Sequence, residues 1–193
     1  MNHLANFGQF QTNEIFPLAY VGYLIWIIAG WLDFRCHRKT DIAHTSGLAE
    51  SKSHLWELGI LAVAVFIFLA LQVNAAQVTL LTLLVVAHAI AGHIDSTIAF
   101  TRHRIVSPWE QWIHSILNMA PWVALVWLSW FSWPEIGWTE PGSWRLHARD
   151  IPFSPLTWTA VLTPPILVNA IPAFREYVIC RRVVSSARSV RLS

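Results

Sequence analysis

Paired histidine and carboxylate side chains recur four times in this sequence, at spacings that place the members of each set on one face of a helix. The residues concerned are Asp33 and His37; Glu50, His54 and Glu57; His88 and Asp95; and Glu110 and His114. Imidazole and carboxylate ligands together suit iron, manganese and zinc. The recurrence therefore predicts a metal site built from four helices, with these residues as candidate ligands.

Pairs of this kind converge in four-helix bundles that hold two iron ions, and this precedent predicts two metal ions here. Iron is the expected metal, and the ligand types also admit zinc or manganese. The sequence has no set of Cys and Met residues that would favour a soft Cu(I) site. The candidate groups outnumber what two ions need, so we expect some of them to orient the direct ligands.

Each set also has a structural explanation, which the sequence leaves open. Asp33 and His37 can be solvated groups at a helix end. The segment Ser107-Pro108-Trp109-Glu110 matches a capping box, which accounts for Glu110 without any metal. A buried histidine such as His88 is often only a hydrogen-bonded core residue. His93 points about 140° away from His88 at ~100° per helical residue, so it serves another face. The sequence does not decide whether His44, His93, His103 and Arg102 take part.

The segments that must position these groups are apolar. Only 12% of the 193 residues are charged, whereas soluble domains average about 25%. Five runs approach the roughly 20 residues that cross a bilayer: 15–32, 55–73, 78–98, 112–133 and 156–178. The predicted fold is an all-α, polytopic membrane bundle of five transmembrane helices, with four converging on the metal site. The proline-rich fifth helix is expected to be a kinked support without a buried carboxylate.

Charge predicts the domain layout and the orientation. We expect one transmembrane domain over residues 1–180 and a detachable basic tail over 181–193. Eleven of the 13 Lys and Arg residues fall on one side of the five predicted spans. The positive-inside rule places that side, the C-terminus and the metal site in the cytoplasm, with the N-terminus outside the bacterial inner membrane. Nucleic-acid binding is not expected, because the net charge is only +2 and the basic residues flank apolar runs.

Several of these spacings carry a family resemblance. His88-x4-His93, within residues 33–114, resembles a histidine box of the membrane di-iron desaturases and hydroxylases, which hold two metals on the cytoplasmic face of a helical bundle. The sequence departs from that family in lacking an HxxHH box and in having more carboxylates. Glu50-x3-His54 and Glu110-x3-His114 are similar to ferritin-type helices but one residue longer than E-x-x-H. The D-x3-H, E-x3-H and P-x-E-x3-H spacings also look similar to a group of small multi-pass bacterial membrane proteins, a likeness that implies no activity.

The desaturase resemblance implies a di-iron oxidoreductase or oxygenase that acts on a lipid-soluble substrate near the cytoplasmic leaflet. Such an enzyme would take electrons from a donor protein. This expectation rests on analogy between folds. Two other functions fit the same ligands: a zinc-dependent membrane hydrolase, in which one carboxylate is the general base for a metal-bound water, and a metal-binding subunit of a larger membrane complex without activity of its own.

Overall fold

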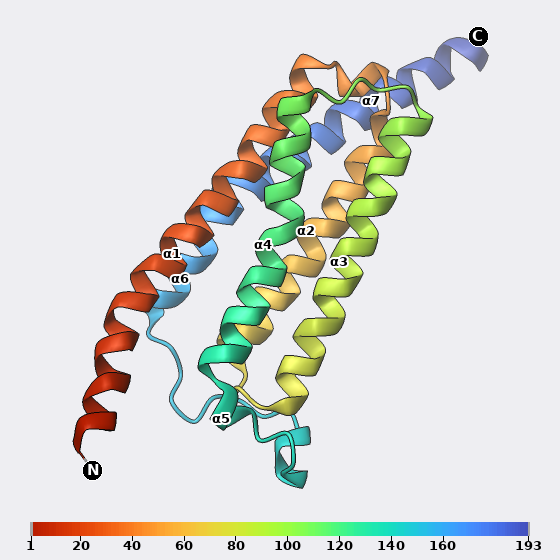
Figure 1. The fold of residues 1–193 in the computed structure, drawn as a ribbon. Coiled ribbons are helices and arrows are strands. Elements are labelled where there is room, and N and C mark those ends of the chain that lie inside the picture. The colour runs from red at the N-terminus through yellow and green to blue at the C-terminus, as the bar shows by residue number, and fades with distance from the viewer. Residues whose placement is uncertain (1, 193) are drawn as a thin grey trace.

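A computed structural model describes the backbone of residues 2–192, and the side chains of residues 17–187 and of Ser189. Within this range the chain is a bundle of helices without a β-strand, which confirms the predicted fold class (Figure 1). The main helices are α1 (Asn2–Lys39), α2 (Gly47–Ala70), α3 (Ala75–Thr101), α4 (Pro108–Phe131), α6 (Pro155–Pro165) and α7 (Ile171–Leu192).

Five helical segments of the described chain are long and apolar enough to cross a membrane, judged by length and composition. They are Pro17–Lys39, Gly47–Ala70, Ala75–Thr101, Pro108–Phe131 and Pro155–Ala187. Their large apolar side chains face outward to an extent that would be costly in water, with Trp56 72% and Phe100 81% exposed. The side chains buried between the helices include many polar and charged ones. This distribution fits a bundle surrounded by lipid.

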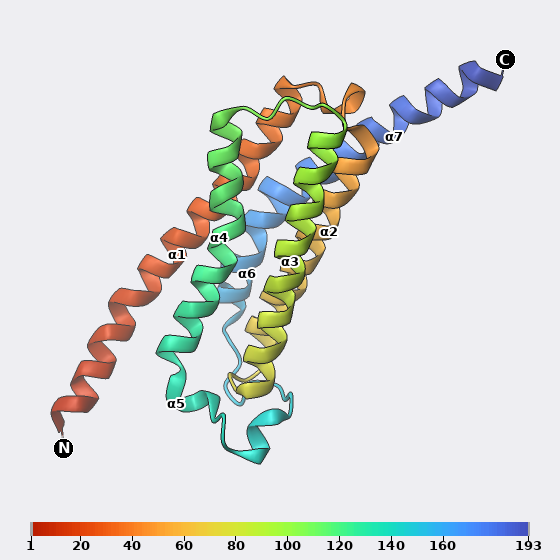
Figure 2. The ribbon, with the colours of Figure 1, turned by 45° about the vertical axis from the view of Figure 1, so that its right-hand side comes forward.

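Helices α1 to α4 lie side by side and run in alternating directions (Figures 1 and 2). The connection between α2 and α3 is short, so these helices are antiparallel neighbours, as the sequence predicts. Asn74 caps α3, because its side chain accepts a 2.9 Å hydrogen bond from the Gln77 amide. The Gln77 side-chain amide donates hydrogen bonds to the carbonyls of Ile67 and Leu71, at 3.1 and 2.9 Å. These bonds stabilise the turn between α2 and α3.

Two connections lie together at the opposite end of the bundle (Figure 1). One joins α1 to α2 through the short helix η1 (Ile42–His44), and the other is the segment 102–107 between α3 and α4. The end with the α2–α3 turn is covered by the segment 132–154, which contains α5 (Trp133–Ile136) and η2 (Pro141–Trp144). This segment pairs with the turn through a 3.1 Å bond from the Arg149 amide to the Ala70 carbonyl.

The fifth span differs from the prediction. Helices α6 and α7 are joined without a break by a π-helical segment, η3 (Ile166–Ala170), directly after Pro164 and Pro165. Prolines lack the amide hydrogen that a regular helix requires, and short π segments are one way of accommodating such disruptions. The helix then continues to Leu192 and extends past the bundle (Figures 1 and 2), so residues 181–192 are helical, and their separation from the transmembrane domain stays a prediction.

Asn169, in η3, fixes the fifth span against α1. With its amide nitrogen facing α1, it donates a 3.0 Å hydrogen bond to the Ile27 carbonyl. The helices approach closely at Gly30, where an added Cβ would lie 2.7 Å from the Asn169 amide. A larger residue at position 30 would displace the Asn169 side chain. The contact sets how α7 lies against the ends of α1 and α2, where the candidate ligands are found.

Candidate metal centre

The predicted ligands other than His88 gather near the end of the bundle that carries the 40–46 and 102–107 connections. They come from the last turns of α1, the first turns of α2 and α4, and the last turns of α3. Most are almost fully buried, with Asp33 6%, His54 7% and Asp95 5% exposed, and His37, Glu50 and Glu110 fully enclosed. Burying so many ionisable groups is costly unless they pair with one another or bind a cation.

The first candidate group joins α1 and α4, and we call it the α1–α4 group: Asp33, His37, Glu110 and His114. One ligand atom from each lies within 4.8 Å of the others. The two Asp33 oxygens face different imidazoles, at 2.9 Å from His114 Nε2 and 3.2 Å from His37 Nε2. Glu110 Oε1 is 3.8 Å from the same His37 nitrogen. Two pairs that are local in the sequence therefore meet across two helices.

The second candidate group, the α1–α2 group, is His37, Glu50 and His54. Glu50 Oε1 lies 3.9 Å from His37 Nε2 and 4.0 Å from His54 Nε2. The two imidazoles stack in nearly parallel planes, with centroids 4.4 Å apart. His37 belongs to both groups, so the two potential metal positions are adjacent.

Glu176 of α7 holds both stacked imidazoles. Its oxygens accept hydrogen bonds from Nδ1 of His37 at 3.1 Å and from Nδ1 of His54 at 2.9 Å. These bonds turn both Nε2 atoms toward the carboxylates of the two groups. A carboxylate that accepts from the far nitrogen of an imidazole is the usual support for a metal-binding histidine. The prediction that the fifth helix lacks a buried carboxylate is therefore wrong, and five helices build the site.

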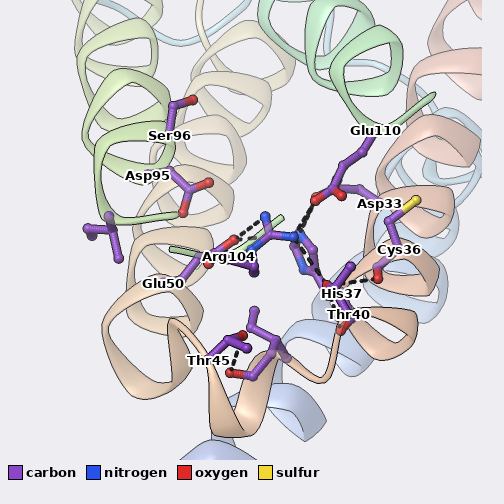
Figure 3. Close-up of polar contacts among 12 residues, drawn as sticks. Asp33, Cys36, His37, Thr40, Thr45, Glu50, Asp95, Ser96, Arg104 and Glu110 are labelled. Carbon is purple, nitrogen blue, oxygen red and sulfur yellow. Dashed lines mark hydrogen bonds and ion pairs between the residues drawn. The ribbon is translucent and has the colours of Figure 1, made fainter. Parts of the chain in front are cut away.

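Arg104, from the 102–107 connection, lies between the two groups (Figure 3). Its guanidinium binds Glu50 through two atoms, with Nε donating to Oε2 at 2.9 Å and Nη2 lying 2.6 Å from Oε1. A third nitrogen, Nη1, donates to Glu110 Oε1 and, at 3.3 Å, to Thr40 Oγ1. Burial alone would lower the pKa of Arg104, but the ion pairs with Glu50 and Glu110 raise it above its ordinary value. The guanidinium is therefore a permanent cation in the centre.

Glu110 has both of the roles that the sequence left open. Ser107 caps α4, with Oγ accepting a 3.2 Å bond from the Glu110 amide. The Glu110 carboxylate does not complete the capping box, because it points inward to Arg104 and His37 (Figure 3). The backbone amide of Glu110 thus takes part in capping α4, and its side-chain carboxylate belongs to the buried cluster.

The remaining predicted ligands lie around the two groups. Asp95 Oδ1 is 3.3 Å from His54 Nε2, which places it next to the α1–α2 group. Glu57 lines a small cavity with Asp95 and His54. His88 is buried farther along α3 and belongs to neither group, so its role as a ligand stays a prediction. His93 is exposed, which agrees with the expected angle between it and His88.

Several buried polar atoms of the cluster have no hydrogen bond of good geometry: Nε2 of His37 and His54, Oε1 of Glu50 and Glu57, Oε2 of Glu110 and Oδ1 of Asp95. Some of them have only ion-pair contacts, at 3.2 Å between His37 and Asp33, 3.3 Å between His54 and Asp95, and 2.6 Å between Glu50 and Arg104. Incomplete hydrogen bonding of buried polar atoms usually indicates an unfilled requirement for a proton, a water or an ion. Imidazole nitrogens and carboxylate oxygens are the donor atoms of mixed N/O metal sites. The residues present therefore fit a metal centre.

Glu176 and Arg104 were missed as members of the site, although each had a signal in the sequence. Glu176 is the sole carboxylate after Asp150, and a single acid within an apolar span points to a buried partner. Arg104 had a weaker signal, because a basic residue in a short connection resembles any solvated charge.

Comparisons of this chain with protein families, with curated proteins and with solved structures find no match.

Proposed function

We propose that this chain is a membrane-embedded di-metal protein, and that it works as a di-iron oxidoreductase or oxygenase on a lipid-soluble substrate. The observation that carries the metal is the pair of imidazoles held by Glu176. Nε2 of His37 lies 3.2 Å from Asp33 Oδ2 and Nε2 of His54 lies 3.3 Å from Asp95 Oδ1. Neither nitrogen makes a hydrogen bond of good geometry there, although His37 and His54 are at most 7% exposed. The two nitrogens thus face carboxylate oxygens with which they could share a metal ion, as in mixed N/O sites.

The charges of the cluster support two ions rather than one. Six carboxylates line it: Asp33, Glu50, Glu57, Asp95, Glu110 and Glu176. The protein opposes them with one guanidinium and three imidazoles, so negative charge remains even if every imidazole is protonated. Two divalent cations beside Arg104 would bring the total near neutrality with the imidazoles neutral. Near-neutrality matters here, because uncompensated buried charge is strongly destabilising.

The assignment to iron and to oxidative chemistry rests on the ligand types and on the architecture. Carboxylate and imidazole pairs that converge in a helical bundle form di-iron sites, and two such ions supply redox chemistry when bound. The chain itself holds the two positions adjacent through His37 and keeps them away from bulk water. The exposed apolar surface around the site suits a substrate that approaches through lipid, and electrons would come from a separate donor protein.

A zinc-dependent hydrolase is the second candidate, and one observation favours it. Glu57 lies beside the site but in neither metal group, and its Oε1 is buried without a hydrogen bond. A hydrolase needs a free carboxylate in such a position to act as general base for a metal-bound water. Metal identity separates the two candidates.

Elemental analysis of the detergent-purified, anaerobically prepared protein tests the proposal. We expect about two iron ions per chain, the number that such carboxylate bundles hold. His37→Ala should lose most of the metal, since His37 belongs to both groups, while the exposed His93→Ala should retain it. Zinc at the same ratio would replace the oxidoreductase with the hydrolase. A chain that binds no metal after reconstitution would eliminate both functions.

A further inference from the structure

A small cavity lies beside both metal groups, at the meeting point of four helices. Its volume is about 30 Å³, which is room for roughly two water molecules. Asp33 and His114 of the α1–α4 group form one side, and His54 of the α1–α2 group forms another. The cavity therefore touches ligands of both proposed metal positions.

Polar atoms with incomplete hydrogen bonding surround this space. Glu57 Oε1 is buried without a hydrogen bond, and His54 Nε2 and Asp95 Oδ1 face each other at 3.3 Å without one of good geometry. All three residues line the cavity. His54 and Asp95 are only 7% and 5% exposed, so water outside the bundle does not satisfy them. A cavity with this lining is polar enough to hold a small ligand rather than to stay dry.

The cavity is not fully enclosed, and Ser96 of α3 is the exposed residue of its lining. Ser96, which lines it, has an exposed side chain whose hydroxyl donates to the Gly92 carbonyl at 3.0 Å. Gly92 and Asn118 form the deeper wall, where the helices are in close contact. A Cβ on Gly92 would lie 2.7 Å from Asn118 Oδ1, so any larger residue there displaces the Asn118 side chain and changes the space available.

We propose that this cavity is the binding site for the small, exchangeable ligand of the metal centre, a water-sized or diatomic molecule that enters beside Ser96. This inference rests on the proposed function, because the ligand binds next to the metals. The volume excludes a lipid-soluble substrate from the cavity. That larger molecule would stay at the bundle surface between α3 and α4, with only the small ligand inside.

The test uses the full-length protein in detergent, loaded anaerobically with Fe(II), and nitric oxide as a diatomic probe. Iron content is measured first, and nitric oxide binding is then titrated by absorbance and electron paramagnetic resonance. Gly92→Ala should weaken nitric oxide binding about tenfold while retaining the iron, because the added methyl group displaces Asn118. Ser96→Leu should slow nitric oxide binding by a similar factor, because it covers the opening.

Two control variants match these changes. Gly59→Ala adds the same methyl group to α2, where nothing lies within 4 Å, and Thr97→Leu adds the same exposed side chain one residue from Ser96 without lining the cavity. Both should bind nitric oxide as the parent does. If Gly92→Ala loses its iron, the Ser96→Leu and Thr97→Leu pair decides. Equal nitric oxide binding in all iron-loaded variants, or none in the iron-loaded parent, overturns the cavity assignment. A parent without iron overturns the proposed function itself.

Discussion

At the scale of single residues, the centre depends on carboxylates that each hold two partners. Glu176 accepts from the imidazoles of His37 and His54, and Asp33 faces those of His37 and His114. Glu110 contacts both a guanidinium and an imidazole. Replacing such a carboxylate with an amide removes its charge and one of its acceptor oxygens while nearly preserving its shape. Carboxylate-to-amide substitutions therefore test whether a side chain acts by its charge and by orienting its partners, or only by filling space.

Glu176→Gln should weaken metal binding about 10- to 100-fold, the usual effect of losing the partner that orients a metal-binding histidine. The amide can accept from only one imidazole, so the other is free to rotate. Competition against a chelator of known affinity measures the change. The matched control is Arg175→Gln, which alters the neighbouring, exposed position on α7 and should leave the affinity unchanged. Parental affinity in Glu176→Gln would show that α7 does not support the site.

Ser107→Ala and Glu110→Gln separate the two roles found at the start of α4. Ser107→Ala removes the cap and should lower the free energy of unfolding by about 1 kcal/mol, with the metal retained. Glu110→Gln keeps the cap but removes a charge that pairs with Arg104, and should cost about 2 kcal/mol. It should also lose the metal of the α1–α4 group. Thermal unfolding in detergent and elemental analysis measure the two effects, and full metal content in Glu110→Gln would exclude Glu110 as a ligand.

The candidate ligands that the sequence revealed are those with a partner on their own helix. Asp33 with His37 and Glu110 with His114 are each four residues apart, and helical geometry alone places them on one face. Glu176 could not be found in this way, since its partner His37 is 139 positions away. Arg104 likewise pairs with Glu50 from another helix. Partners across helices follow from packing, which periodicity in one segment does not contain.

At the scale of elements, the position of α7 depends on the π-helical segment η3 and on its contact with α1. The four earlier spans were predicted from apolar length, because hydropathy alone places such helices in a membrane. The rotation of the fifth span could not be predicted, since a π segment breaks the 3.6-residue repeat. Asn169 and Glu176, which are seven residues apart and both buried, show the face that results.

Gly30→Ala tests this contact. The added methyl group would lie 2.7 Å from the Asn169 amide, so it displaces the Asn169 side chain from its bond to α1, and overpacking of this kind costs about 1–3 kcal/mol. We expect a lower unfolding temperature and weaker metal binding, because Glu176 follows on the same helix. Gly22→Ala is the control on α1, where nothing lies within 4 Å. A Gly30→Ala protein as stable as Gly22→Ala would mean that Asn169 yields without moving α7.

At the scale of the whole molecule, charge asymmetry predicts how the bundle lies in the membrane. The basic residues concentrate on the side that holds the 40–46 and 102–107 connections and the end of α7. A reporter that is active only in the cytoplasm, fused to the C-terminus, should therefore give signal. A periplasm-specific reporter at the same position should remain silent. The reverse pattern would move the metal centre to the outer leaflet, away from cytoplasmic electron donors.

The place of Glu176 in the fifth apolar span determines when the cluster can form during synthesis. Asp33, His37, Glu50 and His54 leave the ribosome long before the acid that orients the two imidazoles. Until α7 has entered the bilayer and docked on Gly30 through Asn169, both rings remain free to rotate. Arg104, by contrast, can pair with Glu50 as soon as α3 is in place. We therefore expect the nascent chain to assemble first around its own internal cation, and the proposed metal to bind only after α7 has docked.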